Sequence, residues 1–382
     1  MNIEDLQLID RILDAEEDIY IKSNKKIINV SNWDPSKEFQ EIMNRVLEIP
    51  VEQDLFSYKY TYTIDPGLKR EALHKLGLNT AEEKKAFGLF FQSSTIAIIN
   101  IINYLSISNY KKICILQPSY FSVKQCCYSL SLNCKCIQME IVDNVPQIPI
   151  GKIIDENFDC LWITSPVLST GFYYNEQQTD IIKNLMTNGI TIVFDESMSY
   201  LGLELIRKFG INENVFYIYS PHKSICINGF KFSVIICSKK HQDVLEQWVD
   251  IFSGGLSISN VDAISHFVSS NFESKCIPVY NSFIGKNKDC VCKIANNYPF
   301  LYYLNETIGH YLTIFTKKRC VDEEKLFNLI YNLISKKNVS FIPGYIDELY
   351  DENCINFRIN LTLDSKNLEY AVNEIFESFN SY

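Results

Sequence analysis

Four short groups of residues with chemically useful side chains follow predicted strands or begin predicted helices. In chain order they are Gln92-Ser93-Ser94-Thr95, Ser165-Pro166-Val167-Leu168-Ser169-Thr170-Gly171, Phe194-Asp195-Glu196, and Ser220-Pro221-His222-Lys223 with Gly229-Phe230-Lys231 after it. Ser94 and Thr95 begin a helix whose free N–H groups and dipole would hold a phosphate, although Ser-Ser-Thr is also an ordinary helix cap. Asp195 ends an apolar strand, where open α/β sheets place ligands, although Asp also often caps the helix after a strand.

The elements that position these groups follow from the hydrophobic pattern. Strands are predicted over 113–117, 134–140, 158–164, 191–196, 215–220 and 232–238. Most are continuous apolar runs, which is typical of strands buried on both faces of a mostly parallel sheet. Helices are predicted over 94–105 and 179–188, the second ended by Gly189. The fold class is therefore α/β, with a mostly parallel sheet covered by helices.

The pattern changes after about residue 270. Strands are predicted over 311–315, 339–342 and 357–361, and helices over 323–337 and from a cap at Asp364 to Phe379. This sequence of elements indicates a second, smaller α+β domain. We expect an N-terminal arm and helices over 1–55 that pack on the small domain, a large domain over 56–270, and a small C-terminal domain over 271–382.

Composition excludes several classes of protein. The 382 residues carry a net charge of −10, which disfavours nucleic-acid binding, and 47% are hydrophobic, enough to bury two cores. The 13 cysteines lie mainly in apolar runs without zinc-like spacing, so we predict free thiols, a reducing compartment and no metal site. The N-terminus does not resemble a signal peptide, and no stretch of about 18 apolar residues occurs. We expect a cytoplasmic protein with no membrane contact.

The order and spacing of the four groups resemble the fold-type I pyridoxal-phosphate enzymes, specifically the class I/II aminotransferase family. The resemblance runs from about Tyr62 to Arg358. It implies the cofactor pyridoxal 5'-phosphate, with Lys223 as the Schiff-base lysine and Asp195 paired with the pyridine nitrogen. The alternatives are a surface lysine and the helix cap named above.

The resemblance also assigns the other cofactor contacts. Ser94, Thr95, Ser220 and Lys231 correspond to phosphate-binding residues, and Tyr120 corresponds to the aromatic residue stacked on the cofactor ring. Tyr62 corresponds to a tyrosine that reaches the phosphate of the neighbouring subunit, which implies a homodimer. Either tyrosine could instead be ordinary packing. Lys231 stands where arginine is commoner, and Ser93 stands where glycine is usual.

Arg358 resembles the arginine that binds the substrate α-carboxylate, although it could instead face solvent from its strand. Three positions depart from the family pattern. Leu168 with Ser169 replaces an asparagine, and Met198 replaces a tyrosine, with Tyr200 two positions further on. His222 directly before the lysine is also seen in the related decarboxylases, where the imidazole packs near the ring, but it could equally be structural.

The predicted activity is an aminotransferase acting on an amino acid or keto acid through an imine with Lys223. A decarboxylase, lyase or cyclase with the same cofactor is the alternative that Leu168, Met198 and His222 favour. A binding or regulatory homologue without catalysis is a third possibility, but both Lys223 and Asp195 are present.

Overall fold

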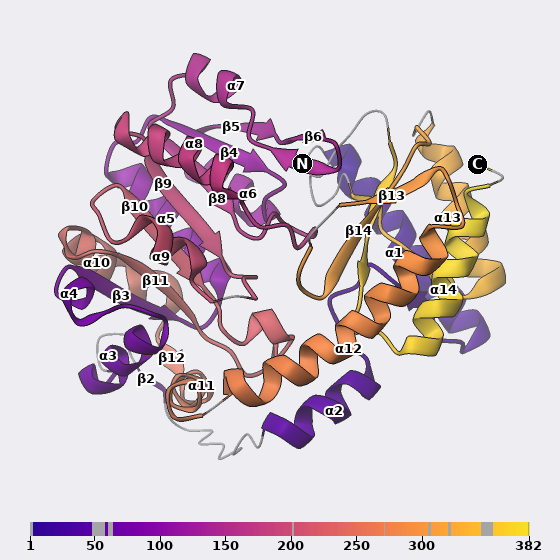
Figure 1. The fold of residues 1–382 in the computed structure, drawn as a ribbon, viewed down its shortest axis with the longest axis horizontal. Helices are drawn as coiled ribbons and strands as arrows, with labels where there is room; N and C mark the ends of the chain where they lie inside the picture. Colours follow the sequence, from indigo (N-terminus) through magenta and orange to yellow (C-terminus); the bar gives the residue numbers. More distant parts are fainter. Residues whose placement is uncertain are drawn as a thin grey trace.

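The computed structural model describes residues 3–47, 58–59, 64–200, 202–270, 272–304, 307–319, 322–344, 354–380 and 382. A seven-stranded sheet forms the part of the molecule on the left of Figure 1. Its strands, in spatial order, are β3 (Ala86–Phe91), β11 (Ser233–Ser238), β10 (Val215–Tyr219), β9 (Thr191–Glu196), β8 (Cys160–Thr164), β4 (Lys112–Gln117) and β5 (Asn133–Gln138). Neighbouring strands are parallel except where β11 pairs with β3 and with β10. The predicted mostly parallel α/β sheet is confirmed.

Helices cover both faces of this central sheet. On one face lie α5 (Ser94–Ile107), α6 (Phe121–Ser129) and α10 (Gln242–Ser253), and on the other lie α8 (Glu176–Thr187) and α9 (Glu204–Phe209). Successive strand residues point to opposite faces, so Val193 of β9 packs with the first helix layer while Ile192 and Phe194 pack with the second. The burial of both faces explains the continuous apolar runs.

Two features of the central sheet differ from the sequence prediction. β3 is absent from the predicted strands, and it contains Gly88, a residue that weakens a strand pattern. A Cβ atom at Gly88 would lie 2.7 Å from Leu73 Cδ2, so glycine allows α3 (Pro66–Lys75) to pack closely on the strand. α8 begins three residues earlier than predicted, because Asn175 and Gln178 form a capping box.

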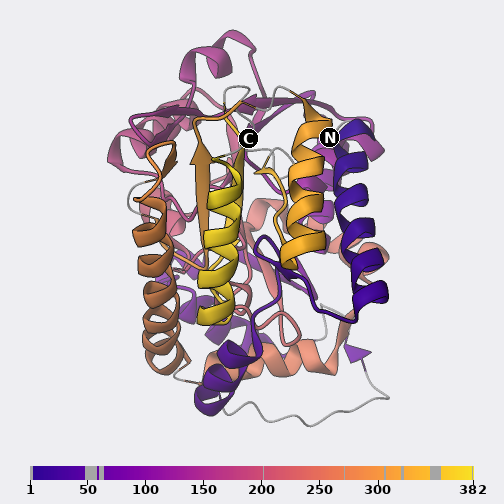
Figure 2. The ribbon, with the colours of Figure 1, turned by 90° about the vertical axis from the view of Figure 1, so that its right-hand side faces the viewer.

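The C-terminal part contains a three-stranded antiparallel sheet with longer helices beside it. The sheet order is β13 (Leu301–Tyr303), β14 (Tyr311–Thr316), β16 (Asn356–Asn360). Figure 2 shows α12 (Phe272–Ala295), α14 (Ser365–Ser378), α13 (Glu323–Lys337) and α1 (Ile3–Ser23) side by side. The predicted helix over 323–337 and the cap at Asp364 agree with α13 and α14. The strand predicted over 339–342 is shorter, β15 (Val339–Ser340).

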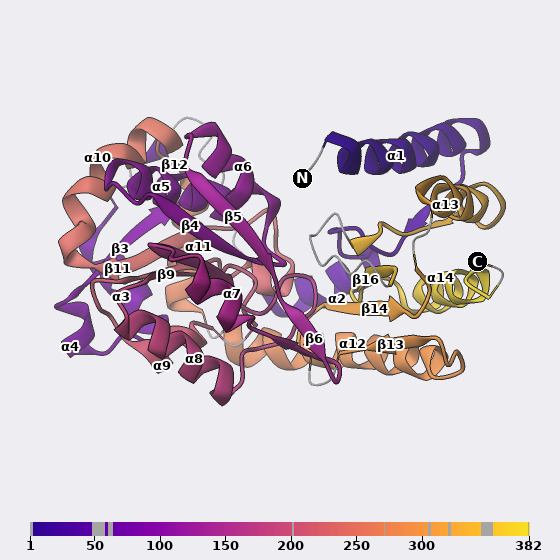
Figure 3. The same ribbon diagram turned by 90° about the horizontal axis from the view of Figure 1, so that it is seen from above.

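The N-terminal segment packs on the C-terminal part of the chain. α1 packs on α13, β1 (Ile28–Asn29) pairs in parallel with β15, and α2 (Lys37–Leu47) packs on α12. Arg11 of α1 lies 2.8 Å from Glu324 and 3.9 Å from the centre of the Phe327 ring. In Figure 3, α12 runs from beneath the central sheet to the C-terminal helices. The limits 1–55, 56–270 and 271–382 stay a prediction.

The sequence analysis predicts that the cysteines are free thiols, and most of them lie in the described residues. Twelve cysteines lie in this part of the chain, and all are free thiols. Burial raises the pKa of Cys114 to about 12, so this thiol stays protonated. No helix in the described ranges is long and apolar enough to cross a membrane, and no group of three or more His, Cys, Asp or Glu side chains there is placed to hold a metal ion.

Candidate active site

Lys223 lies in the turn that follows β10, at the carboxyl edge of the central sheet. Its backbone N–H donates to the Ser220 carbonyl at 3.0 Å, and a short 3₁₀ helix, η2 (Lys223–Ile225), begins there. The Lys223 amine donates to Ser94 Oγ at 3.3 Å and lies 5.3 Å from the centre of the Tyr120 ring. Ser94 begins α5 and Tyr120 precedes α6, so the fold brings predicted residues from three segments to one point.

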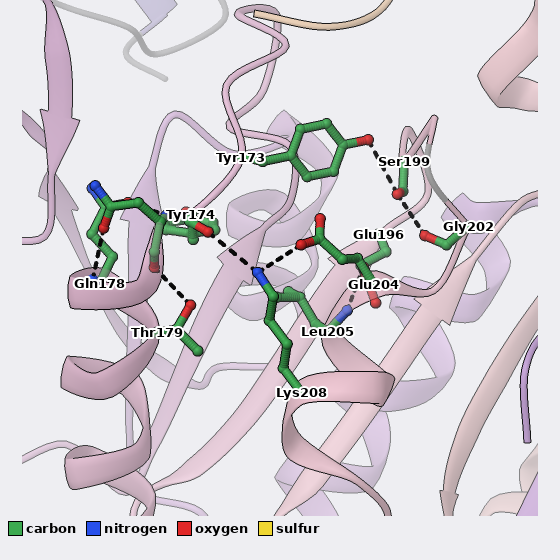
Figure 4. Close-up of polar contacts among 11 residues, drawn as sticks. Tyr173, Tyr174, Gln178, Thr179, Glu196, Ser199, Gly202, Glu204, Leu205 and Lys208 are labelled. Carbon is green, nitrogen blue, oxygen red and sulfur yellow. Dashed lines mark hydrogen bonds and ion pairs between the residues drawn. The ribbon is translucent and has the colours of Figure 1, made fainter. Parts of the chain in front are cut away.

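Asp195 and Glu196 end β9 and point to opposite faces of the sheet. Ser197 donates its backbone N–H and its hydroxyl to Oδ1 of the buried Asp195, at 3.1 and 2.5 Å, and no donor among the described residues reaches Oδ2. Glu196 faces α9, where the backbone N–H of Leu205 donates to Glu196 Oε1 at 3.1 Å, beside the Lys208–Glu204 ion pair (Figure 4). The side chain that accepts a hydrogen bond from the next helix is therefore that of Glu196. Asp195 lies on the opposite face, within range of the Lys223 charge.

Burial and mutual charge shift the pKa values of Lys223 and Asp195. Burial lowers the pKa of Lys223, the Asp195 carboxylate opposes that shift, and the charge of Lys231 adds to it. Burial raises the pKa of Asp195, while the hydrogen bonds from Ser197 and the charge of Lys223 oppose the rise. A lysine with a lowered pKa is more readily neutral, and the neutral amine is the form that attacks an aldehyde.

The start of α5 presents backbone donors beside the lysine. Ser93 caps the helix, with its Oγ accepting from the Ile96 N–H at 3.4 Å. Ser94 and Thr95 are the first two helical residues, where N–H groups have no partner within the helix. This arrangement suits an anion, as the sequence predicts.

Two further predicted residues lie where β10 ends and β11 begins. Ser220 and Ser233 share a hydrogen bond between their hydroxyl oxygens at 2.5 Å. Lys231 is fixed through its backbone, since Asn260 Nδ2 donates to the Lys231 carbonyl at 2.7 Å. Its charge acts on Lys223, so it lies in the electrostatic range of the site. Ser233 is not predicted by the sequence, because only the antiparallel β10–β11 pairing brings it beside Ser220.

Arg358 lies on β16 with its guanidinium buried between two aromatic rings. Its Cζ atom lies 4.3 Å from the centre of the Trp33 ring and 5.1 Å from that of Tyr311. Nε donates to the Ser31 carbonyl at 3.0 Å, and Nη1 donates to Ser169 Oγ at 3.2 Å. Only 6% of the residue is exposed, so the alternative of a solvent-facing strand arginine is wrong.

The positions that depart from the family pattern are also defined. Leu168 and Met198 are buried apolar side chains, and Ser169 has a positive φ of 63°. Tyr200, the tyrosine nearest to Met198, is bonded to a histidine, since its hydroxyl lies 3.1 Å from His310 Nδ1. Leu168 and Met198, which stand where the family that the sequence resembles has asparagine and tyrosine, therefore offer no polar donor, and the Tyr200 hydroxyl contacts His310.

His222 packs in an aromatic cluster beneath the lysine turn. Its ring centre lies 5.6 Å from those of Phe230 and Phe232, and 6.4 Å from those of His266 and Phe267 on α11 (Ile258–Ser269). Burial lowers the pKa of His222 to about 3, so the imidazole is neutral. These contacts favour the structural reading of His222.

Several side chains at the site carry no sequence signal of their own. Trp33 lies 5.8 Å from the Lys223 amine by its ring centre, and His310 lies close enough to Lys223 and Arg358 for their charges to act on it. Both come from segments far from the four groups, and only the packing of the C-terminal part brings them here. Tyr62 lies outside the described residues.

The residues present fit pyridoxal phosphate. A buried carboxylate, Asp195, has an oxygen that no described donor reaches, as a protonated ring nitrogen requires. The Lys223 amine lies against the Tyr120 ring, and donors at the start of α5 and at Ser220 suit the phosphate. These groups match the ring nitrogen, the aldehyde and the phosphate of the cofactor.

Comparison with solved structures gives the fold directly. The chain resembles a kynurenine aminotransferase from Pyrococcus horikoshii with a TM-score of 0.76 and 14% identity, covering 96% of this chain and 94% of that one. It resembles an alanine aminotransferase from Pyrococcus furiosus with a TM-score of 0.75 and 13% identity, covering 98% and 97%. A C-S lyase from Staphylococcus hominis gives a TM-score of 0.71 and 15% identity, covering 93% and 89%.

No protein-family profile and no curated protein sequence matches the chain. The likeness to solved structures therefore rests on the fold, which extends over nearly the whole of each protein. The fold-type I architecture predicted from the four groups is confirmed.

Proposed function

We propose that this protein is a pyridoxal-phosphate-dependent aminotransferase that acts on an amino acid. The observation that carries the proposal is the position of the Trp33 ring, 5.8 Å from the Lys223 amine and 4.3 Å from Arg358 Cζ. An α-amino acid presents an amine and a carboxylate close together, and Lys223, which the substrate amine would replace, lies against the same aromatic ring as Arg358, which would bind the carboxylate. The aminotransferases with the same fold support the proposal.

Pyridoxal phosphate would supply an aldehyde for Lys223 and a ring that accepts electrons from the substrate. We assign Asp195 to keep the ring nitrogen protonated and Tyr120 to stack on the ring. Ser94, Thr95, Ser220 and Lys231 are the residues we assign to the phosphate. Among similar folds, the kynurenine aminotransferase was solved with PMP and the C-S lyase with PLP, which supports this cofactor.

Lys223 has a second task once a substrate amine has displaced it. The free Lys223 amine, whose pKa burial lowers, would accept the proton from the substrate α-carbon and deliver it to the cofactor carbon that bears the aldehyde. Arg358 would bind the α-carboxylate and so hold the substrate with its Cα–H bond toward Lys223. Water would supply the oxygen of the keto acid that leaves, and the amino nitrogen would stay on the cofactor.

A decarboxylase, lyase or cyclase with the same cofactor is the second candidate. Leu168 and Met198 favour it, because neither can donate to the cofactor as the family's asparagine and tyrosine do. Tyr200 does not restore a donor while its hydroxyl is bonded to His310. The C-S lyase with the same fold supports this alternative.

Incubation with single amino acids in the absence of a keto acid separates the candidates. A transaminase converts its cofactor to the amine form once, in a stoichiometric amount, and releases one keto acid per site. Continuous release of carbon dioxide, or of a product that keeps its nitrogen, would move the protein to the second candidate. Failure to take up pyridoxal phosphate, measured by visible absorption, would leave a non-catalytic binding protein.

We also propose a homodimer in the cytoplasm. The dimer follows from the resemblance of Tyr62 to a residue that serves the neighbouring subunit, and the free cysteines among the described residues fit a reducing compartment. Sedimentation equilibrium tests the dimer. Tyr62→Phe should weaken retention of the cofactor, and an unchanged affinity in this variant would contradict the role of Tyr62.

A further inference from the structure

His310 lies at the junction of four segments beside the candidate site. It directly precedes β14 and is 2% exposed. The Tyr200 and Tyr280 hydroxyls lie 3.1 and 3.0 Å from His310 Nδ1, from the segment after β9 and from α12. The imidazole also hydrogen-bonds the backbone of Ser224, in the 3₁₀ turn that begins with Lys223.

The backbone of His310 connects this junction to the strand of Arg358. The Leu361 N–H donates to the His310 carbonyl at 2.7 Å, and Thr313 pairs with Arg358 three residues further along β14. A short path of hydrogen bonds and backbone therefore joins Lys223 to Arg358. It runs from Lys223 through Ser224 and His310 to Leu361, three residues from Arg358.

The chemistry of the ring fits this arrangement. The Ser224 carbonyl can only accept, so the ring nitrogen that meets it carries the proton of the neutral imidazole. Nδ1, which faces the two tyrosine hydroxyls, is then the acceptor, and the proton lies on Nε2. Burial and the charges of Arg358 and Lys223 lower the pKa of His310 to about 3, so this neutral form persists at ordinary pH. Both ring nitrogens of His310 therefore take part in hydrogen bonds.

The two residues before His310 pack closely against neighbouring segments. A Cβ atom at Gly309 would lie 2.0 Å from the Tyr200 ring, and Gly309 has a φ of 111°, which favours glycine. The Ile308 N–H donates to the Gly171 carbonyl at 2.8 Å. This segment therefore contacts both the Gly171 loop and the Tyr200 segment.

We propose that His310 is a positioning residue that fixes the Lys223 turn relative to the Arg358 strand. Its effect on turnover rests on the proposed function, because the spacing of Lys223 and Arg358 then decides whether one amino acid reaches both. The hydrogen bond to Ser224 is the critical link, and the two tyrosines hold the ring in the orientation that makes it.

Two substitutions test the roles of the two His310 ring nitrogens separately. His310→Gln keeps a donor near the position of Nε2, and His310→Asn keeps an acceptor near the position of Nδ1 but loses the reach to Ser224. We expect His310→Asn to lower kcat/KM for the amino acid roughly tenfold, mostly through KM, as for the loss of one buried hydrogen bond. His310→Gln should restore most of the loss, and both variants should retain the cofactor absorption.

His241 provides a matched control. Its Nδ1 lies 2.7 Å from the Tyr104 hydroxyl and its Nε2 lies 2.9 Å from the Glu213 carbonyl, on the buried face of the sheet near α5 and α10. His241→Asn should reduce thermal stability to a similar extent without changing KM. An equal rise in KM in this variant would show a general loss of stability and overturn the positioning role.

Hydrogen exchange of the cofactor-free protein gives a readout that does not depend on the proposed activity. His310→Asn should speed exchange together in peptides that cover 223–227 and 357–361, while His241→Asn should not. Unchanged exchange in either peptide would overturn the proposal. Absence of cofactor uptake by the wild-type protein would instead refute the proposed function and leave this measurement interpretable.

Discussion

The two sides of the candidate site are built in different ways. On the side of the central sheet, Asp195 ends β9 and Lys223 follows β10, and these strands pair in parallel with Ile218 opposite Asp195. On the opposite side, Arg358 donates to the Ser31 carbonyl, 327 residues away in the chain. One side is positioned by adjacent strands, and the other by long-range contacts.

The difference predicts how each side responds to change. Lys223 is half-buried in the turn after β10, a strand whose pairing does not depend on the Lys223 side chain. Arg358 supports the packing around it, because its guanidinium holds Ser31, Ser169 and the Trp33 ring together. Substitution of the first should change chemistry alone, and substitution of the second should change both stability and binding.

Lys223→Ala should have the largest effect on activity. Removing the amine that we propose binds the cofactor and moves the proton should lower turnover by about 10²- to 10⁴-fold, with little change in the melting temperature. Borohydride reduction of the wild-type protein followed by peptide mapping should place the pyridoxyl group on Lys223. A label on another lysine would contradict the assignment.

Arg358→Ala should raise KM for amino acids by about ten- to a hundredfold, corresponding to the loss of a charge-assisted hydrogen bond of about 2 kcal/mol. It should also lower the free energy of unfolding by about 1.5–3 kcal/mol, because the Ser31 carbonyl loses its charged donor. Arg11→Ala is the control. Like Arg358, Arg11 stacks on an aromatic ring, that of Phe327, and its charge pairs with Glu324, but it lies away from the site. Arg11→Ala should lower the free energy of unfolding by less than about 1 kcal/mol.

Glu196→Gln should change the pH dependence of stability on the side of the central sheet. Burial, with the nearby charges of Glu204 and Asp195, raises the pKa of Glu196 to about 8. Folding therefore favours the protonated acid, and that contribution is lost as pH rises from about 4.5 through 8. The variant should gain stability relative to wild type by about 1.4 kcal/mol per pH unit in this range. Urea unfolding at several pH values checks this, and a constant difference would contradict it.

Asp364→Ala should have the smallest effect and tests a local signal inside the C-terminal part. Asp364 Oδ1 accepts from the backbone N–H groups of Lys366 and Asn367 at 3.1 Å each, which caps α14. Its loss should cost about 1 kcal/mol of unfolding free energy with KM unchanged. Asp364→Asn, which keeps the cap, should be nearly neutral. A changed KM would mean that local and long-range contributions are not separable here.

The same contrast explains what the sequence predicts. The helix over 323–337 and the Asp364 cap are predicted to the residue because their signals lie within one turn of the helix. The position of Asp195 and Lys223 at one edge of the sheet is predictable, because both follow predicted strands and parallel strands bring their carboxyl ends to one edge. Their roles rest on the resemblance and stay predictions. Trp33 and His310 give no such signal, since an isolated tryptophan or histidine acquires its neighbours only when distant segments pack. β3 escapes prediction because Gly88 interrupts its apolar run.

The parallel pairing of β1 with β15 also has a consequence for synthesis of the chain. The strands of the central sheet lie within 86–238, so this sheet can assemble while later residues are still being made. Residues 28–29 must wait for 339–340, and the buried apolar residues Leu8 and Ile12 of α1 wait for α13. Contacts of such high sequence separation form slowly. The segment that carries Ser31 and Trp33 is therefore among the first made and the last to reach its place.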